Sequence, residues 1–69
     1  MERVTETFQL TVNDKLVEVF NDGTKLFKDQ HPQAMKDLKW WIEKELKEGK
    51  TESWTPYNNF ESSVKFKII

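Results

Sequence analysis

The side chains that most often carry out covalent catalysis are few in this chain of 69 residues. Hydrolysis by a catalytic triad needs a nucleophile, a base and an acid that orients the base. The only histidine, His31, precedes a proline. The serines lie in or near a polar connection, at Ser53, Ser62 and Ser63. Because no motif groups these residue types, we expect a protein that is not an enzyme.

The residue types needed for a zinc site or a phosphate-binding loop are also scarce. Zinc sites in proteins are built mainly from cysteine and histidine, and the chain has no cysteine and one histidine. Loops that cradle phosphate need several glycines, whereas Gly23 and Gly49 stand alone. Carboxylates such as Glu43 have lysine four residues further on, which is the favourable order for a solvated helical ion pair. We therefore expect no metal and no cofactor.

A tryptophan among lysines is the first candidate for a binding surface. The stretch PQAMKDLKWWIEKELKEG, from Pro32 to Gly49, predicts a helix, because proline suits its first position and glycine ends its last turn. On a helical wheel, four residues share an arc of about 80° on the outer side of this helix: Lys36, Trp40, Lys44 and Lys47. This arc is expected to bind a partner. In the alternative interpretations, the ring lies under the 54–60 connection or under the lysine stems.

The remaining segments alternate apolar and polar residues, as strands do. Residues 4–12 and 15–20 predict a hairpin around an Asn13-Asp14 turn, with Phe8 opposite Val19. Asp22-Gly23 predicts a second turn that leads into a third strand at TKLFK, residues 24–28, with a short helical turn over 24–30 as the alternative. Residues 62–69 predict a closing strand, and TESW, residues 51–54, a short strand before it.

One helix can cover only one face of such a sheet. The apolar stripe of the helix, Met35, Leu38, Ile42 and Leu46 with Trp41 beside it, is expected to pack on the inner side. The open face is expected to display Leu16, Phe20, Lys25, Phe27, Lys65 and Lys67, with Ile69 at its end. This open face predicts a protein interface, with a second copy of the chain as the favoured occupant. The alternative is single-stranded nucleic acid, which stacks on aromatic rings and places its phosphates along lysines.

The fold prediction is one α+β domain over residues 1–69: a small, mostly antiparallel sheet in the order β-β-β-α-β or β-β-β-α-β-β, with one helix packed on one face. A formal charge of -1 argues against a binder that coats nucleic acid by charge alone. The absence of cysteine favours the cytoplasm, and no apolar run is long enough to span a bilayer. We expect a small non-enzymatic binding module, a regulatory or accessory factor, that uses neither a membrane nor a small-molecule cofactor.

Overall fold

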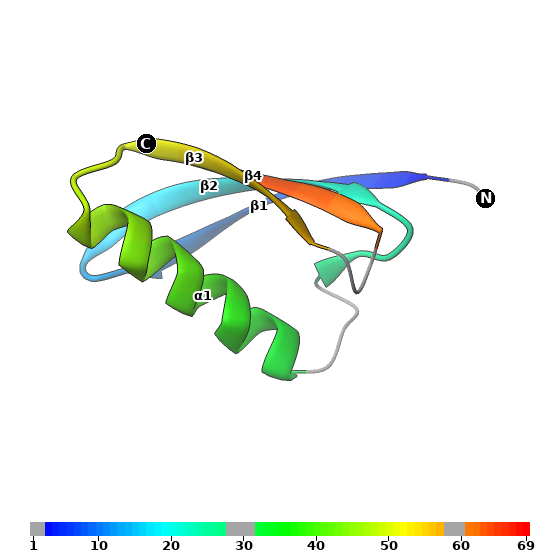
Figure 1. Cartoon of the computed structure of the whole chain (residues 1–69), viewed down its shortest axis with the longest axis horizontal. Coiled ribbons are helices and arrows are strands. Elements are labelled where there is room, and N and C mark those ends of the chain that lie inside the picture. Colours follow the sequence, from blue (N-terminus) through cyan, green and yellow to red (C-terminus); the bar gives the residue numbers. More distant parts are fainter. Residues whose placement is uncertain (1–2, 28–31, 58–60) are drawn as a thin grey trace.

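Four strands form one antiparallel sheet, and a single helix lies across one of its faces (Figure 1). This is a computed structural model, and it describes residues 3–27, 32–57 and 61–69. The elements are β1 (Val4–Val12), β2 (Lys15–Gly23), α1 (Pro32–Lys47), β3 (Glu52–Tyr57) and β4 (Ser62–Ile68). The strand order across the sheet is β1-β2-β4-β3. The predicted fold class is confirmed, and the observed order along the chain is β-β-α-β-β.

The β1–β2 hairpin has the register that the alternation predicts. Phe8 lies opposite Val19, and the pairing continues without a bulge from the turn to Val4 opposite Gly23. Asn13 and Asp14 have φ values of 51° and 64°, which a two-residue turn with the twist of the strands requires. Because a slip of one residue would turn every apolar side chain outward, burial of one face fixes this register.

The predicted third strand is wrong for the part that the structure describes, residues 24–27. The chain does not turn at Gly23, because β2 continues to that residue and takes β4, not the following segment, as its second neighbour. Residues 24–27 instead fold under the sheet. There Phe27 is fully buried, and its N–H donates to the carboxylate of Glu6. Position 28, the rest of the alternative 24–30 turn and His31 lie outside the described residues.

Gly23 does not form the hairpin turn that the sequence predicts; it allows two strands to approach each other closely. A Cβ atom on Gly23 would lie 1.9 Å from the Cβ of Ser62, at the start of β4. No side chain fits at that distance, so glycine lets β2 and β4 begin their pairing side by side.

The helix begins and ends where proline and glycine predict. Pro32 is its first residue, and Gly49 follows its end with a φ of 86°. The N–H of Gly49 donates to the Leu46 carbonyl (3.0 Å), and the N–H of Lys50 donates to the Glu45 carbonyl (3.2 Å). These two bonds form a Schellman motif, which satisfies carbonyls at the end of the helix.

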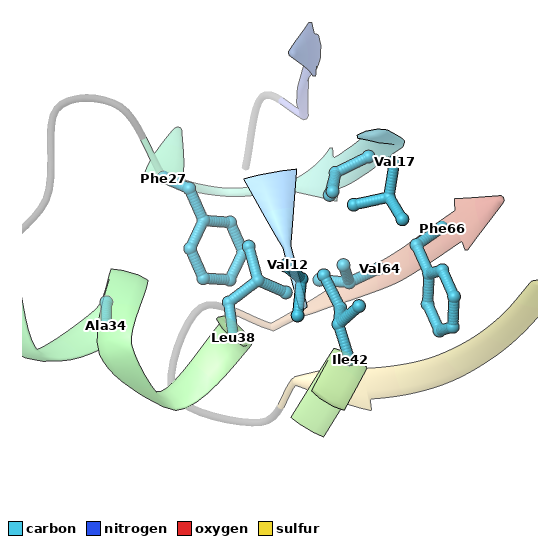
Figure 2. Packing of buried hydrophobic residues seen from close by; sticks show 9 residues of the cluster. Val12, Val17, Phe27, Ala34, Leu38, Ile42, Val64 and Phe66 are labelled. Atoms are coloured by element: carbon cyan, nitrogen blue, oxygen red, sulfur yellow. The ribbon is translucent and has the colours of Figure 1, made fainter. Parts of the chain in front are cut away.

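The core lies between α1 and the inner face of the sheet. Figure 2 shows Leu38 and Ile42 of the helix pointing toward valines of the strands, Phe66 of β4 and Phe27. The buried cluster consists of Val12, Val17, Val19, Phe27, Ala34, Leu38, Ile42, Val64 and Phe66. Trp41 closes one side, with its ring edge-on to Phe66 at 5.2 Å between centroids. Among the described residues, no helix is long and apolar enough to cross a membrane.

Candidate functional site

The outer face of the sheet, the side turned away from α1, carries a row of aromatic, basic and aromatic side chains. Phe20 of β2 lies opposite Lys65 of β4, and Lys65 lies opposite Trp54 of β3. Phe20 is 43% exposed and Trp54 is 59% exposed. Cross-strand neighbours on one face have Cβ atoms about 5 Å apart, so the register places Lys65 between the two aromatic residues. Nothing in the described part of the chain covers this row.

The next row on the outer face has a net negative charge. Lys67 of β4 lies between Glu18 of β2 and Glu52 of β3. Lys67 thus has an acidic residue opposite it on each neighbouring strand, whereas Lys65 has aromatic neighbours on both sides. Within the described residues, Lys65 makes no ion pair. Lys65 is therefore the cation of this face whose charge its cross-strand neighbours leave unbalanced.

Two exposed aliphatic side chains extend the apolar surface at the end of the sheet. The N–H of Ile69 donates to the carbonyl of Leu16 at 3.1 Å, which continues the β2–β4 ladder by one residue. Both side chains are exposed. Between β2 and β4 the outer face has an open hollow of about 300 Å³, lined by Glu18, Phe20, Lys65, Phe66 and Lys67. We name Leu16, Phe20, Trp54, Lys65, Lys67 and Ile69 the outer-face cluster.

A hydrogen-bonded carboxylate, Glu45, holds β3 in the position that presents Trp54. It accepts hydrogen bonds from Ser53 Oγ (3.0 Å), Lys50 Nζ (3.1 Å) and Trp41 Nε1 (3.2 Å). The Lys50 ammonium group, helped by the Ser53 hydroxyl, holds the pKa of the Glu45 carboxyl below its ordinary value, although desolvation acts in the opposite direction. The same carboxylate raises the pKa of Lys50. This contact joins the C-terminal end of α1 to the start of β3.

Two residues predicted for the open face do not lie on it. Phe27 is fully buried, with its ring edge-on to Tyr57 at 5.2 Å, because the 24–27 segment folds under the sheet instead of extending it. Lys25 is exposed but belongs to the same segment, where its carbonyl accepts a hydrogen bond from Asn21 Nδ2 at 2.9 Å. The structure does bring Leu16, Phe20, Lys65 and Lys67 together on one face, as predicted.

Trp54 is a member of this face that the sequence pattern did not reveal. The pattern predicts TESW only as a short strand beside a polar connection, which leaves its pairing with β4 unassigned. The alternation within β3 is the signal that could have found it. Ser53, Thr55 and Tyr57 are partly buried, while Trp54 and Pro56 point to the other side.

The outer side of α1 is exposed, as the helical wheel predicts. Trp40 is 66% exposed, and the described part of the 54–60 connection does not bury it. Lys44 Nζ lies 5.9 Å from the centroid of its ring. Lys36 and Lys47 are exposed as well, but Lys47 pairs with Glu43 at 3.1 Å. A hollow of about 310 Å³ beside the ring is lined by Trp40, Glu43, Lys44, Lys47 and Glu48.

The charges beside Trp40 cancel, since two lysines and two glutamates line that hollow. Among the described residues, this surface offers a single ring with no second large apolar side chain in the lining of the hollow. The outer-face cluster, by contrast, joins two aromatic and two aliphatic side chains on adjacent strands. We therefore consider the outer-face cluster the stronger candidate for a binding site.

Comparison of the chain with protein-family models, with curated proteins and with solved structures finds no match. Within residues 3–27, 32–57 and 61–69, no group of three or more histidine, cysteine or acidic side chains is arranged to hold a metal ion.

Proposed function

We propose that this chain is a non-enzymatic binding module that acts through protein–protein contacts at its outer face. Its partner is a protein segment that presents apolar side chains around a carboxylate. The observation that carries the proposal is the row in which Lys65 lies between the exposed rings of Phe20 and Trp54. An acidic side chain of the partner would pair with Lys65, while its apolar neighbours cover the two rings. The absence of cysteine is consistent with action in the cytoplasm.

Charge balance favours a protein over a polyanion on this face. A nucleic acid needs several uncompensated cations to replace the counterions of its phosphates. Lys67 lies between two glutamates, and Arg3 is already paired with Asp22 at 3.2 Å. One unbalanced lysine suffices for a single carboxylate but gives little affinity for a chain of phosphates.

The same lysine bears on whether this face binds a second copy of the chain. Because β4 is an inner strand of the sheet, Lys65 lies near the middle of the face. Packing two outer faces about a two-fold axis would bring the Lys65 side chains of the two copies toward each other. A carboxylate-bearing partner avoids this repulsion, so we place a different protein on this face.

Photochemical crosslinking in cells tests the proposal directly. A photoreactive amino acid in place of Trp54 should give covalent adducts with a protein, and the added substitution Lys65→Glu should abolish them. The matched control has the same amino acid in place of Trp40, which is also more than half exposed but lies on α1. No adduct from position 54, or adducts that persist in Lys65→Glu, would contradict the proposal. Adducts near twice 8.3 kDa would identify a second copy as the occupant.

Single-stranded nucleic acid is the second candidate, because two rings flanking a lysine on an open sheet are also typical of base-stacking surfaces. The test is fluorescence anisotropy of a labelled oligothymidine at low salt. This candidate predicts binding that weakens with salt and in Trp54→Ala and Lys65→Ala. Unchanged anisotropy at low salt would reject it.

A further inference from the structure

The two edges of the sheet differ in how well they are protected against pairing with another strand. β3 is six residues long and contains Pro56, which has no N–H to donate. β1 is nine residues long and contains no proline, glycine or lysine. It is also free of bulges, since all nine residues pair in sequence with β2. Short length, proline, lysine and bulges blunt natural edge strands, and β1 has none of them. Its one inward-pointing charge, Glu6, is hydrogen-bonded within the chain, so β1 remains an edge suited to pairing.

The hairpin geometry shows which backbone groups of β1 point to the free edge. Val12 and Lys15 flank the two-residue turn and therefore form a hydrogen-bonded pair. Hydrogen-bonded and non-hydrogen-bonded pairs alternate along an antiparallel hairpin, so Leu10 and Phe8 also bond to β2. The residues between them direct their N–H and C=O groups away from β2: Thr5, Thr7, Gln9 and Thr11. Within the described residues, no strand pairs with this side of β1.

The side chains of β1 match those of a second β1. Phe8 and Leu10 point to the inner side and are only partly buried, because they lie at the margin of the core. An antiparallel copy, related by a two-fold axis perpendicular to the sheet, would place its own Phe8 and Leu10 on the same side. Pairing centred on Phe8 aligns all nine residues and brings two phenylalanine rings together in a non-hydrogen-bonded pair, where side chains are closest.

Charge and rigidity also favour this pairing. Glu6 is the only charged residue of β1, and its carboxylate is buried and accepts hydrogen bonds from Asn21 Nδ2 (3.2 Å) and from the N–H of Phe27. No like charges therefore oppose each other across the edge. Arg3 ties the start of β1 to its neighbour, with its guanidinium group bonded to the carboxylate and carbonyl of Asp22. The strand is thus held in the conformation that a partner strand requires, which lowers the entropic cost of pairing.

We propose that two copies of this chain pair through β1 and form one continuous eight-stranded antiparallel sheet, with both helices on the same side. The dimer would double the outer face. The outer face of a single chain is four strands wide and on the order of 400 Å² in area, whereas a standard interface buries about 800 Å² per partner. The outer faces of the two paired copies together would have about the area that a standard interface buries on each partner. The larger face matters only if the outer face binds a protein as proposed above, but the strand pairing rests on the β1 edge alone.

Sedimentation velocity over a concentration series tests the proposal with the intact chain. The wild type should approach twice 8.3 kDa at high concentration. Thr7→Pro removes an N–H that does not bond to β2. Because of the two-fold axis, the dimer loses this hydrogen bond twice, so its dissociation constant should rise about tenfold. Thr7→Val keeps the N–H and is the matched control. Gln9→Lys, which puts a charge at the edge, provides a second test if Thr7→Pro does not fold by circular dichroism.

Hydrogen exchange measured by NMR gives an independent readout of the same pairing. In dilute protein the amides of Thr5, Thr7, Gln9 and Thr11 should exchange fast, and at high concentration they should become protected. The amides of Phe8 and Leu10 should be protected at both concentrations, because they bond to β2. A monomer at all concentrations would overturn the proposal. So would a dimer that Trp54→Ala abolishes and Thr7→Pro leaves intact, since that result would place self-association on the outer face.

Discussion

The two faces of the sheet are built from alternate residues of the same strands, yet they differ in burial and in composition. Phe66 and Lys65 are neighbours in β4, and one is fully buried under α1 while the other stands between two exposed rings. The inner face is mainly apolar and packs against the helix (Figure 2), with Glu6, Asn21 and Ser62 as its buried polar side chains. The outer face mixes aromatic, aliphatic and charged side chains. In a chain this small, the alternation of a strand separates the residues that stabilise the fold from those free to bind.

The largest effect is expected from truncating the inner face. Phe66→Ala should lower the free energy of unfolding by about 3–5 kcal/mol, because it removes a fully buried ring and leaves a cavity. That loss is comparable to the whole stability of a small domain. Urea denaturation followed by circular dichroism measures it. Lys65→Ala, the matched change on the other face, should cost less than about 0.5 kcal/mol. Equal losses of unfolding free energy in the two variants would contradict the distinction between a stabilising inner face and an exposed outer face.

The junction of β2 and β4 should be the next most sensitive point. Gly23→Ala places a Cβ 1.9 Å from the Ser62 Cβ and should destabilise the fold by about 1–3 kcal/mol. Ser62→Gly removes the opposing Cβ, so the double variant should recover part of that loss. Thermal unfolding of the two single variants and the double variant measures the coupling. If the two losses simply add, the close approach is not the reason for glycine at this position.

The outer face should respond in binding and hardly in stability. Trp54→Ala and Phe20→Ala should each change the free energy of unfolding by less than about 1 kcal/mol, because both rings are half exposed. Each should weaken partner binding by at least about 2 kcal/mol, as central aromatic residues of interfaces do. Isothermal titration calorimetry with the purified protein that crosslinking identifies measures the change in binding free energy. A loss of stability of about 3 kcal/mol, typical of a buried aromatic ring, would instead assign the ring to the fold.

The smallest effect concerns pH and the contact between α1 and β3. The pKa of Glu45 is lowered in the folded chain, so its contribution is present above the ordinary value of 4.5 and is lost as pH falls through the lowered pKa. The pKa of Lys50 is raised, so its contribution is present below 10.5 and is lost as pH rises through the raised pKa. In Glu45→Gln, the decline of the melting temperature at both ends of the pH range should be shallower. Curves that run parallel to the wild type would show that the pair does not stabilise the fold.

The sequence predicted those elements whose signals are local. The Asn13-Asp14 turn, the alternation of β1, and the proline and glycine that bound α1 each act within a few residues, and the structure confirms all of them. The inner stripe of the helix was also predicted correctly, because the side that needs burial follows from helical spacing alone. Apart from Trp54, the members of the outer-face cluster followed from the alternation of their strands.

The errors share one cause, which is pairing between strands far apart in the sequence. Asp22-Gly23 resembles a hairpin turn, but the pairing of β2 with β4 extends to Asp22 and makes Gly23 a point of close approach. Phe27 was therefore assigned to a strand that does not exist. Trp54 was missed because the face on which it lies depends on the register of β3 with β4. The pairing of β2 with β4, and that of β3 with β4, cannot be predicted from the residues adjacent to Gly23 or Trp54.

The claim that the outer face is the bound surface can be tested most directly by hydroxyl-radical footprinting of the chain inside cells and in dilute purified form. Both Phe20 and Trp54 should oxidise readily in the purified protein and be protected in cells, while Trp40, which is exposed on α1, should oxidise in both. Equal oxidation of Phe20 and Trp54 in the two samples, or protection confined to Trp40, would contradict the claim.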